Sequence, residues 1–384
     1  ETFIIKFETD VFESFWKHFI ILSISTGQVR ESFMPYERRQ LPINAICFVG
    51  VLILFSILKS IEIFLPTWNI PITIVKGITS AIPLGLAIFA TTQRPDFFNI
   101  GFSVVLFAYF IGEGVGHEAI YYAVSQDGYN WEQVNDGNPV LSASLGECGC
   151  RDVEIIRLKT GSFVILTTDL CIANRYDENY NIDWKKVNSS GSKNLRMWKT
   201  EDLVNFSQEK LIYFGRDDFG CLWAPEIFYD EINDEYLIHW GSTVKEDGFS
   251  HMSIYCSTTK DFETFTEPKI FFTKENEILD SHIVKIRDLY HLFYKNAHNP
   301  GMNMHSTSKN LYGPFTHDQS FQDYMASDEA TFNKPGSYEA PTTFVLPDGK
   351  WCLMLDFFGC EKRKNGLCAI YFIKTGRYEC YPLS

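Results

Sequence analysis

Carboxylates recur at the head of similar segments in the second part of the chain. They are Asp152, Glu226, Asp280 and Glu339, and each opens a β-type run that leads to a tight polar turn and a second run. Carboxyl groups that meet in one place push their pKa values apart, so one stays protonated near neutrality beside an ionised neighbour. Such a pair supplies the acid and the base for cleavage of a glycosidic bond. We therefore expect acid–base chemistry wherever the fold brings these groups together.

The elements that must position these groups form a repeat. After the second run comes a third, which closes on a small polar segment ending in an aromatic residue. These segments read SQDGYNW, KTEDLVNF, TKDFETF and SKNLYGPF, beginning at Ser125, Lys199, Thr259 and Ser308. Short β-runs with regular turn signals are typical of an all-β array, and four-strand units of this kind are typical of propeller blades. The sequence predicts an all-β, five-bladed β-propeller over residues 101–384, with the first strand of each blade lining the axis.

One blade is expected to be incomplete. The runs Phe102–Tyr109 and Ala119–Val124 have no carboxylate-bearing strand before them, so they resemble the outer part of a fifth blade. Propellers are commonly sealed by a strand from the other end of the chain, which removes exposed edges. The sequence stops shortly after the run AIYFIK. We expect either a truncated C-terminus or substitution by part of residues 85–100, with Asp96 as a weak candidate for an axial acid.

Residues 1–100 have a different character and are expected to be helical. Leu41–Leu58 and Gly77–Thr92 are uncharged runs at the lower edge of bilayer-spanning length. Arginines flank them at Arg38, Arg39 and Arg94, which would place both ends of a hairpin, and the catalytic domain, in the cytoplasm. Two readings stay open: a membrane anchor through residues 41–92, and a pair of buried helices or a non-native extension.

Charge and cysteine content narrow the function classes. The formal net charge of −14 argues against nucleic acid, whose phosphates are bound by clustered Lys and Arg. Among 10 cysteines only Cys148 and Cys150 stand close together, without a second pair at zinc-binding spacing. We expect free thiols, no metal and no cofactor.

Four motifs carry a family resemblance. RDVEIIR, WAPEIFYD, LDSHIVK and YEAPTTF resemble, in the same order, the R-D-P, W-A-P, I-D and E-G-P segments of glycoside hydrolase family 43. The resemblance runs from about Val105 to Phe372. It implies a five-bladed propeller that hydrolyses arabinosyl or xylosyl linkages, with a carbohydrate as its partner.

The resemblance also implies roles for individual residues. Asp152 would be the base that activates water, Glu339 the acid that protonates the departing oxygen, and Asp280 the third carboxylate, which orients the acid. The mechanism would be inverting, with acid and base roughly 6.5 to 9.5 Å apart. Trp223 and Glu226 would line the substrate pocket. Arg151 would bind a neighbouring acid or a sugar hydroxyl, or serve as a strut.

The motifs depart from the family at two positions, and other functions remain open. Val153 stands where the family usually has proline and Ala340 where it usually has glycine, so reduced activity is one expectation. The alternatives are a carbohydrate-binding propeller without catalysis, a membrane-tethered receptor domain, a fructan-cleaving enzyme and a mannoside phosphorylase. The fructan class needs a W-M-N-D-P-type segment that the sequence lacks, and phosphorolysis needs a basic pocket.

Overall fold

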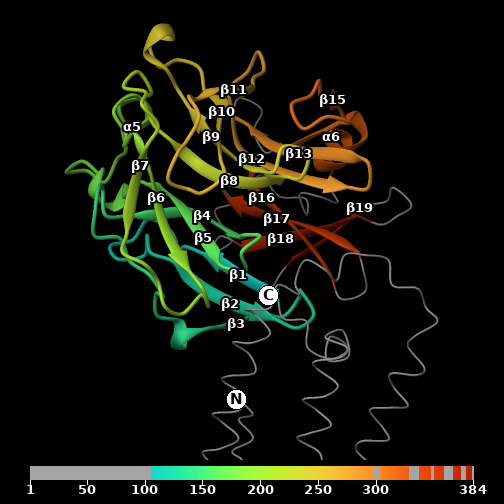
Figure 1. Ribbon diagram of the computed structural model, residues 1–384, viewed down its shortest axis with the longest axis horizontal. Coiled ribbons are helices and arrows are strands. Elements are labelled where there is room, and N and C mark those ends of the chain that lie inside the picture. Colours follow the sequence, from blue (N-terminus) through green and yellow to red (C-terminus); the bar gives the residue numbers. More distant parts are fainter. Residues whose placement is uncertain are drawn as a thin grey trace, which may run out of the picture. The chain divides into compact units, whose positions relative to one another are not determined.

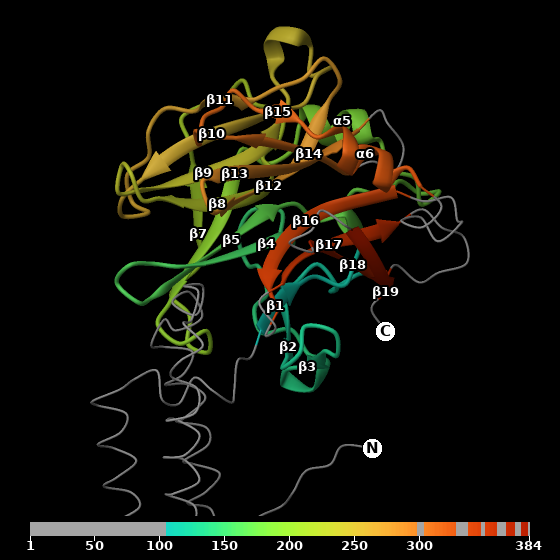
Figure 2. The same cartoon turned by 90° about the vertical axis from the view of Figure 1, so that its right-hand side faces the viewer.

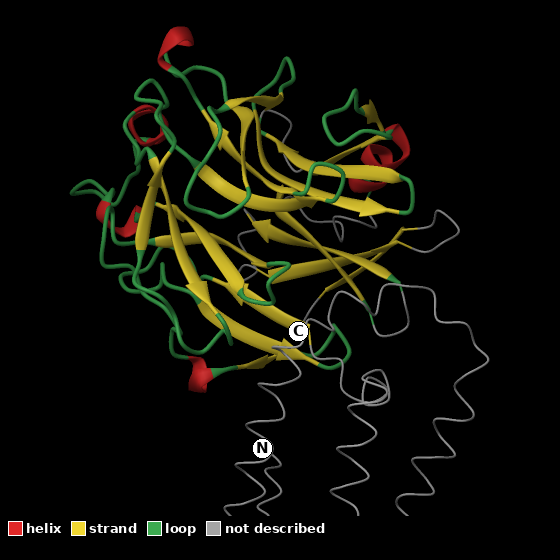
Figure 3. Cartoon of the chain, in the orientation of Figure 1, coloured by secondary structure: helices red, strands yellow, loops and turns green. Residues whose placement is uncertain are grey.

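The computed structural model describes residues 105–297, 303–327, 337–346, 350–358, 366–372 and 378–382. Strands dominate this part of the chain, and the helices are short (Figure 3). The strands form five antiparallel sheets in chain order, one blade each (Figure 1). The predicted all-β propeller is therefore confirmed.

The blades are numbered along the chain, and all but the first have four strands. Blade 1 consists of β1 (Val105–Tyr109), β2 (Tyr121–Ser125) and β3 (Glu132–Gln133). Blade 2 consists of β4 (Cys150–Arg157), β5 (Phe163–Asp169), β6 (Asn194–Thr200) and β7 (Lys210–Tyr213). Blade 3 consists of β8 (Trp223–Asp230), β9 (Glu235–Ser242), β10 (Ser253–Thr259) and β11 (Lys269–Phe272). Blade 4 consists of β12 (Ile278–Ile286), β13 (Leu289–Asn296), β14 (Asn303–Ser308) and β15 (Thr316–His317). Blade 5 consists of β16 (Ser337–Val345), β17 (Trp351–Phe358), β18 (Gly366–Phe372) and β19 (Tyr378–Pro382).

Two short α-helices lie in connections between strands. Helix α5 (Trp184–Ser189) lies between β5 and β6, and α6 (Gln319–Met325) lies between β15 and β16. The carboxylates of Asp183 and Asp318 cap their N-termini by accepting backbone N–H groups. Single-turn 3-10 segments occur at Asn135–Gly137, Ile172–Asn174 and Lys245–Asp247.

The core lies between the blades rather than within them. Side chains alternate along a strand, so the second strand of each blade contributes side chains to two interfaces between blades. In β5, Val164 and Leu166 pack toward blade 3, while Phe163 and Ile165 pack toward blade 1. The same alternation joins blade 3 to blade 4 and blade 4 to blade 5. This packing brings β4, β8, β12 and β16 side by side in the middle of the unit (Figures 1 and 2).

The closing segments of the repeat are turns held by hydrogen bonds from backbone N–H groups to side chains. In blade 2, the hydroxyl of Thr200 accepts the Leu203 N–H at 2.9 Å, and Asp202 accepts the N–H groups of Val204 and Asn205. Ser125 and Thr259 begin equivalent turns in blades 1 and 3. The repeated hydroxyl and carboxylate therefore satisfy backbone donors where the third strand ends.

Blade 1 lacks an innermost strand among the described residues. In blade 1 the same hydrogen-bonded turn follows β2, whereas in other blades it follows the third strand. Strands β1 and β2 therefore correspond to the second and third strands of a blade. β1 also packs against β4, as β5 packs against β8. The expectation that this blade is incomplete therefore stays a prediction. Residues 85–100, including Asp96, lie outside the described residues.

The hydrophobic runs 41–58 and 77–92 also lie outside the described residues, so the membrane hairpin stays a prediction. Within the described ranges, no helix is both long and apolar enough to cross a bilayer.

Candidate active site

The inner strands of blades 2 to 5 share a β-bulge. Their pairing with the second strand shifts register after Arg151, Trp223, Leu279 and Glu339. The next residue has a positive φ in each case: 52° at Asp152, 48° at Ala224, 49° at Asp280 and 49° at Ala340. Such a backbone costs an L-residue roughly 1–2 kcal/mol, and bulges are used to re-aim side chains. The four strands therefore present equivalent positions to the axis.

The four acids at the heads of the repeated segments do not occupy one equivalent position. Asp152 and Asp280 occupy the bulge itself, Glu339 precedes it, and Glu226 follows it by two residues. The position of Glu226 is filled in β4 by Glu154, which the sequence analysis did not single out. The four carboxylates thus lie at different levels along their strands. The sequence repeat alone does not show these differences in level.

Asp280, Glu339 and Asp152 come from three blades, and the charges of the other two act on Asp280. Burial and the neighbouring charges of Glu339 and Asp152 raise the pKa of Asp280 to about 7, against the opposing effect of Lys295. The Ala340 N–H donates to Asp280 Oδ2 at 3.4 Å, which places this carboxylate beside the residue that follows Glu339. The structure therefore groups the three residues expected to be catalytic.

Lys295 contacts Glu339 directly. Its ammonium group donates to Glu339 Oε2, and the two side chains are 19% and 29% exposed. Lys295 lies near the end of β13, opposite Leu279 and therefore next to Asp280. The sequence offered one signal for it: a lysine that follows an apolar second-strand run, LYHLFY.

The carboxylate of Asp152 is held from the second strand of its own blade. Thr168 on β5 donates its hydroxyl to Asp152 Oδ2 at 2.6 Å, and accepts the Ala224 N–H at 2.8 Å. Thr168 therefore ties the bulge of β4 to the bulge of β8. This contact fixes the orientation of one Asp152 oxygen.

Arg151 acts as a strut in this structure. Its guanidinium donates to Glu118 at 2.9 Å and lies 4.7 Å from the ring centre of Phe110. Glu118 is buried and also accepts the N–H groups of Ile172 and Ala173. The pair therefore fastens the connection after β5 to the start of β4.

Trp223 lies at the first position of β8, and its neighbours are apolar. Its ring meets the ring of Trp184 edge-on at 6.4 Å between centroids, and it packs against the cluster of Leu170, Ile172 and Val187. Trp184 is one of the exposed large hydrophobic residues.

A second cluster of polar residues lies beyond the bulges, where Glu226 and His282 each follow the positive-φ residue of their strand by two positions. Glu226 Oε2 is 2.8 Å from His282 Nδ1, and His282 Nε2 is 2.8 Å from the hydroxyl of Thr343. Burial raises the pKa of Glu226 and lowers that of His282 to about 4. Burial and the charge of Glu226 also raise the pKa of Glu154. Burial thus favours the neutral form of each group, and the two side chains are joined by a hydrogen bond.

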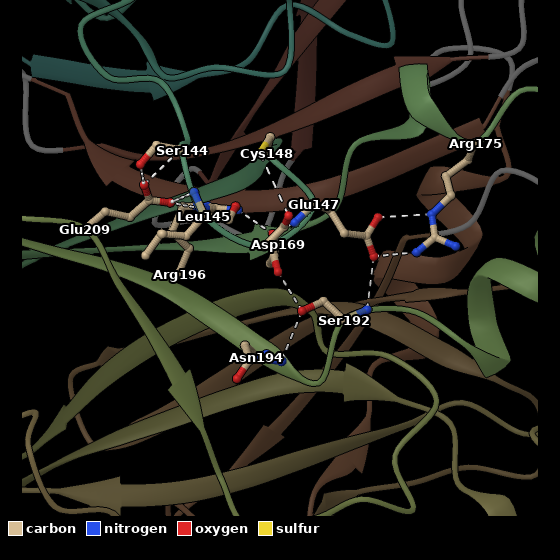
Figure 4. A network of polar contacts seen from close by, with 11 residues as sticks. Ser144, Leu145, Glu147, Cys148, Asp169, Arg175, Ser192, Asn194, Arg196 and Glu209 are labelled. Atoms are coloured by element: carbon tan, nitrogen blue, oxygen red, sulfur yellow. Dashed lines mark hydrogen bonds and ion pairs between the residues drawn. The ribbon is translucent and has the colours of Figure 1, made fainter.

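The connection that leads into Asp152 is fixed by buried charge (Figure 4). Arg196, fully buried on β6, pairs with Asp169 and Glu209 and donates to the Leu145 carbonyl at 3.0 Å. Glu209 accepts the Ser144 N–H at 2.8 Å, and Asp169 accepts the Glu147 N–H at 2.8 Å.

A second branch of the same network holds the far side of that connection. Glu147 accepts from Arg175 Nε at 3.0 Å and from the Ser192 N–H at 3.1 Å, while Ser192 Oγ donates to Asp169 at 2.6 Å. Cys148 and Cys150 lie in this region as free thiols, the first exposed and the second buried.

The comparisons with known proteins agree with this architecture. A family model described as "Probable glycosyl hydrolase domain" matches residues 102–367. A curated relative, the alpha-L-arabinofuranosidase of Bifidobacterium longum subsp. longum, is 24% identical over 189 residues, which is 44% of this chain and 17% of that protein.

Solved structures share the fold at low identity. A mutant of the glycoside hydrolase family 43 protein BlXynB from Bacillus licheniformis matches with a TM-score of 0.50 and 13% identity, covering 73% of this chain and 53% of that one. The xylan beta-1,4-xylosidase from Bacillus halodurans matches with a TM-score of 0.50 and 13% identity, covering 72% and 52%. The chain thus spans about half the length of these structures. It belongs to the family of glycosyl hydrolase domains related to glycoside hydrolase family 43.

Proposed function

We propose that this protein is an inverting glycoside hydrolase that cleaves arabinofuranosyl or xylosyl units from oligosaccharides or polysaccharides. The observation that carries the proposal is the grouping of Asp152, Asp280 and Glu339 from three blades, with the pKa of Asp280 raised by its two partners as well as by burial. Carboxyl groups with separated pKa values are what single-displacement hydrolysis of a glycoside requires.

In the proposed mechanism, Asp152 removes a proton from a water molecule, whose oxygen attacks the anomeric carbon of the sugar. Glu339 gives its proton to the oxygen of the departing group as the bond to the anomeric carbon breaks. One displacement inverts the anomeric configuration. Thr168 supports the base, because its hydroxyl holds one oxygen of Asp152.

The proposed substrate class rests on the named relatives and on two aromatic side chains near the start of β8. The curated relative is an arabinofuranosidase and one structural neighbour is a xylosidase, so both pentosides are candidates. Trp223 and Trp184 supply aromatic surface beside β8, and such rings stack against the apolar faces of sugars. Glu226 is assigned to substrate binding rather than proton transfer, since His282 already holds one of its oxygens.

The test is hydrolysis of aryl α-L-arabinofuranoside and aryl β-xyloside by the wild type, by Glu339→Gln and by Asp152→Asn. We expect turnover by the wild type on at least one substrate, and a loss on the order of 10³-fold or more in each variant. Glu263→Gln, an exposed carboxylate of the outer surface, is the matched control and should retain activity.

Absence of wild-type turnover on both substrates, together with measurable oligosaccharide binding by calorimetry, would favour the carbohydrate-binding propeller over the enzyme. Equal activity of Glu339→Gln and the wild type would remove Glu339 from the mechanism.

A further inference from the structure

We propose that Lys295 is a positioning residue of the active site, which holds the carboxyl group of Glu339 and balances the charge that develops there during proton transfer. This inference rests on the proposed function, because it gives Lys295 a part in the step assigned to Glu339.

The geometry places Lys295 between two blades. It projects from β13 of blade 4, and its ammonium group forms an ion pair with Glu339 on β16 of blade 5. The contact is largely buried, since the lysine side chain is 19% exposed and the glutamate side chain 29% exposed. An ion pair in such surroundings is screened much less than one on the surface. It therefore restricts where the Glu339 carboxyl can point.

The charges around Lys295 come from several strands. Asp280 on β12, Glu339 on β16 and Asp356 on β17 all favour its protonated form, and together they outweigh burial, so its pKa is raised. The charge of Asp152 on β4 also acts on Asp280. A single ammonium group thus stands among three carboxyl groups, and two of these are assigned to catalysis.

This arrangement suits the acid step. When the Glu339 proton passes to the departing oxygen, the carboxyl group becomes a carboxylate, and the ammonium group of Lys295 is already in place to stabilise it. No solvent reorganisation is needed at that moment, which is the condition under which fixed charges contribute most to catalysis. The ligand-free structure shows the contact that the ionised acid would make.

The test compares Lys295→Met, Lys295→Arg and Lys285→Met. Lys285 is on β12, 4.0 Å from Glu231, so its substitution removes the same charge away from the three carboxyl groups. We expect Lys295→Met to lower kcat on the order of 10²-fold with a much smaller change in KM, because the charge matters in the transition state. Lys295→Arg should recover part of that loss, and Lys285→Met should match the wild type.

A second readout does not need turnover. Carbon-13 NMR of the carboxyl groups follows the titration of Asp280, which should move to higher pH in Lys295→Met, because Lys295 opposes the other influences on this group. Lys295→Arg should keep the wild-type titration. Lys295→Gln serves the same measurements if the methionine variant does not fold.

The two failures can be told apart. A wild type without turnover overturns the proposed function. A wild type with turnover, whose Lys295→Met variant keeps both kcat and the Asp280 titration, overturns only the role of Lys295. Loss of activity with an unchanged titration and no recovery in Lys295→Arg would make the residue merely structural, and would also contradict the inference.

Discussion

Asp280 combines a functional position with a cost in stability. Its pKa of about 7 lies above 3.8, the ordinary value for an aspartate. As pH rises from about 4 to 7, the unfolded chain releases this proton while the folded protein keeps it, so the free energy of unfolding falls across that window. Above pH 7 the folded protein holds an unfavourable charge. The residue is retained where stability alone would disfavour it.

Asp280→Asn should therefore abolish activity and raise the melting temperature. The gain should be small near pH 4 and about 2 °C or more at pH 8. Asparagine also tolerates the positive φ at this position, so the backbone should not change. Calorimetry at both pH values measures the effect.

Asp261→Asn is the control with the opposite sign. Backbone N–H groups of Thr264 and Glu263 lower the pKa of Asp261 to about 2. That stabilisation is present at neutral pH and is lost as pH falls toward 2, so this variant should lower the melting temperature near pH 7 and match the wild type in acid. An Asp280→Asn gain that is independent of pH would contradict the assignment.

Thr168 offers a test of how the base is oriented. Thr168→Val keeps the shape of the side chain but removes the hydroxyl that contacts Asp152 and the Ala224 N–H. We expect kcat to fall on the order of tenfold with little change in KM, as for loss of one orienting hydrogen bond. Thr167→Val, at the next position of β5, is the control. Equal kcat values for the two variants would exclude an orienting role for Thr168.

Some of these residues could be predicted from sequence and others could not. Asp152, Asp280 and Glu339 each stand in a recognisable motif at the start of an inner strand, so they could be found by pattern. Lys295, Thr168 and His282 lie inside strands, where the same side chain could serve packing or solvent. Their roles depend on which blade lies next, and a single sequence with no pairing information does not specify that.

At the scale of elements, the bulge of the inner strand is the shared device. Ala340 is exposed and adopts a φ of 49°, a conformation that glycine reaches without a steric penalty. The backbone at Ala340 thus has a conformation that suits the family's usual glycine, although Ala340 carries a side chain that glycine lacks. The two-residue alternation of the strands could be read from the sequence, but the register shift could not, because it depends on the partner strand.

Ala340→Gly should raise the free energy of unfolding by about 0.5–1 kcal/mol, since relief of the left-handed conformation exceeds the added entropy of the unfolded chain. Activity should be equal or higher. Ala123→Gly, at a buried position of β2 with no positive φ, should instead lower stability by about 1 kcal/mol or more. Urea unfolding of both variants checks this, and equal losses would show that the bulge holds no strain.

The buried network behind the Asp152 connection is a second element with a measurable cost. Arg196→Met leaves Asp169 and Glu209 without their cation, and breaking a buried ion pair by removing one partner typically costs about 3–5 kcal/mol. Amide exchange from Ser144 to Cys148 should accelerate. Lys210→Met, which removes an exposed contact to Glu263, should cost less than about 1 kcal/mol. Comparable losses in the two variants would contradict the structural role given to Arg196.

At the scale of the whole molecule, the propeller brings residues that are far apart in the sequence close together in space. Each second strand packs on the inner strand of the following blade, so the inner strands of blades 2 to 5 line up along one axis. The sequence could predict this ring, because four repeats carried the same order of strand and turn. It could not predict which strand completes blade 1, since no motif in the repeat marks that strand.

The central claim is that Asp152 and Glu339 carry out one displacement with water. Proton NMR of the wild type hydrolysing an aryl α-L-arabinofuranoside or aryl β-xyloside tests it most directly, because the first-formed sugar shows its anomeric configuration before mutarotation. We predict that this first product has the configuration opposite to that of the substrate. A first product that retains the substrate's configuration would contradict the mechanism.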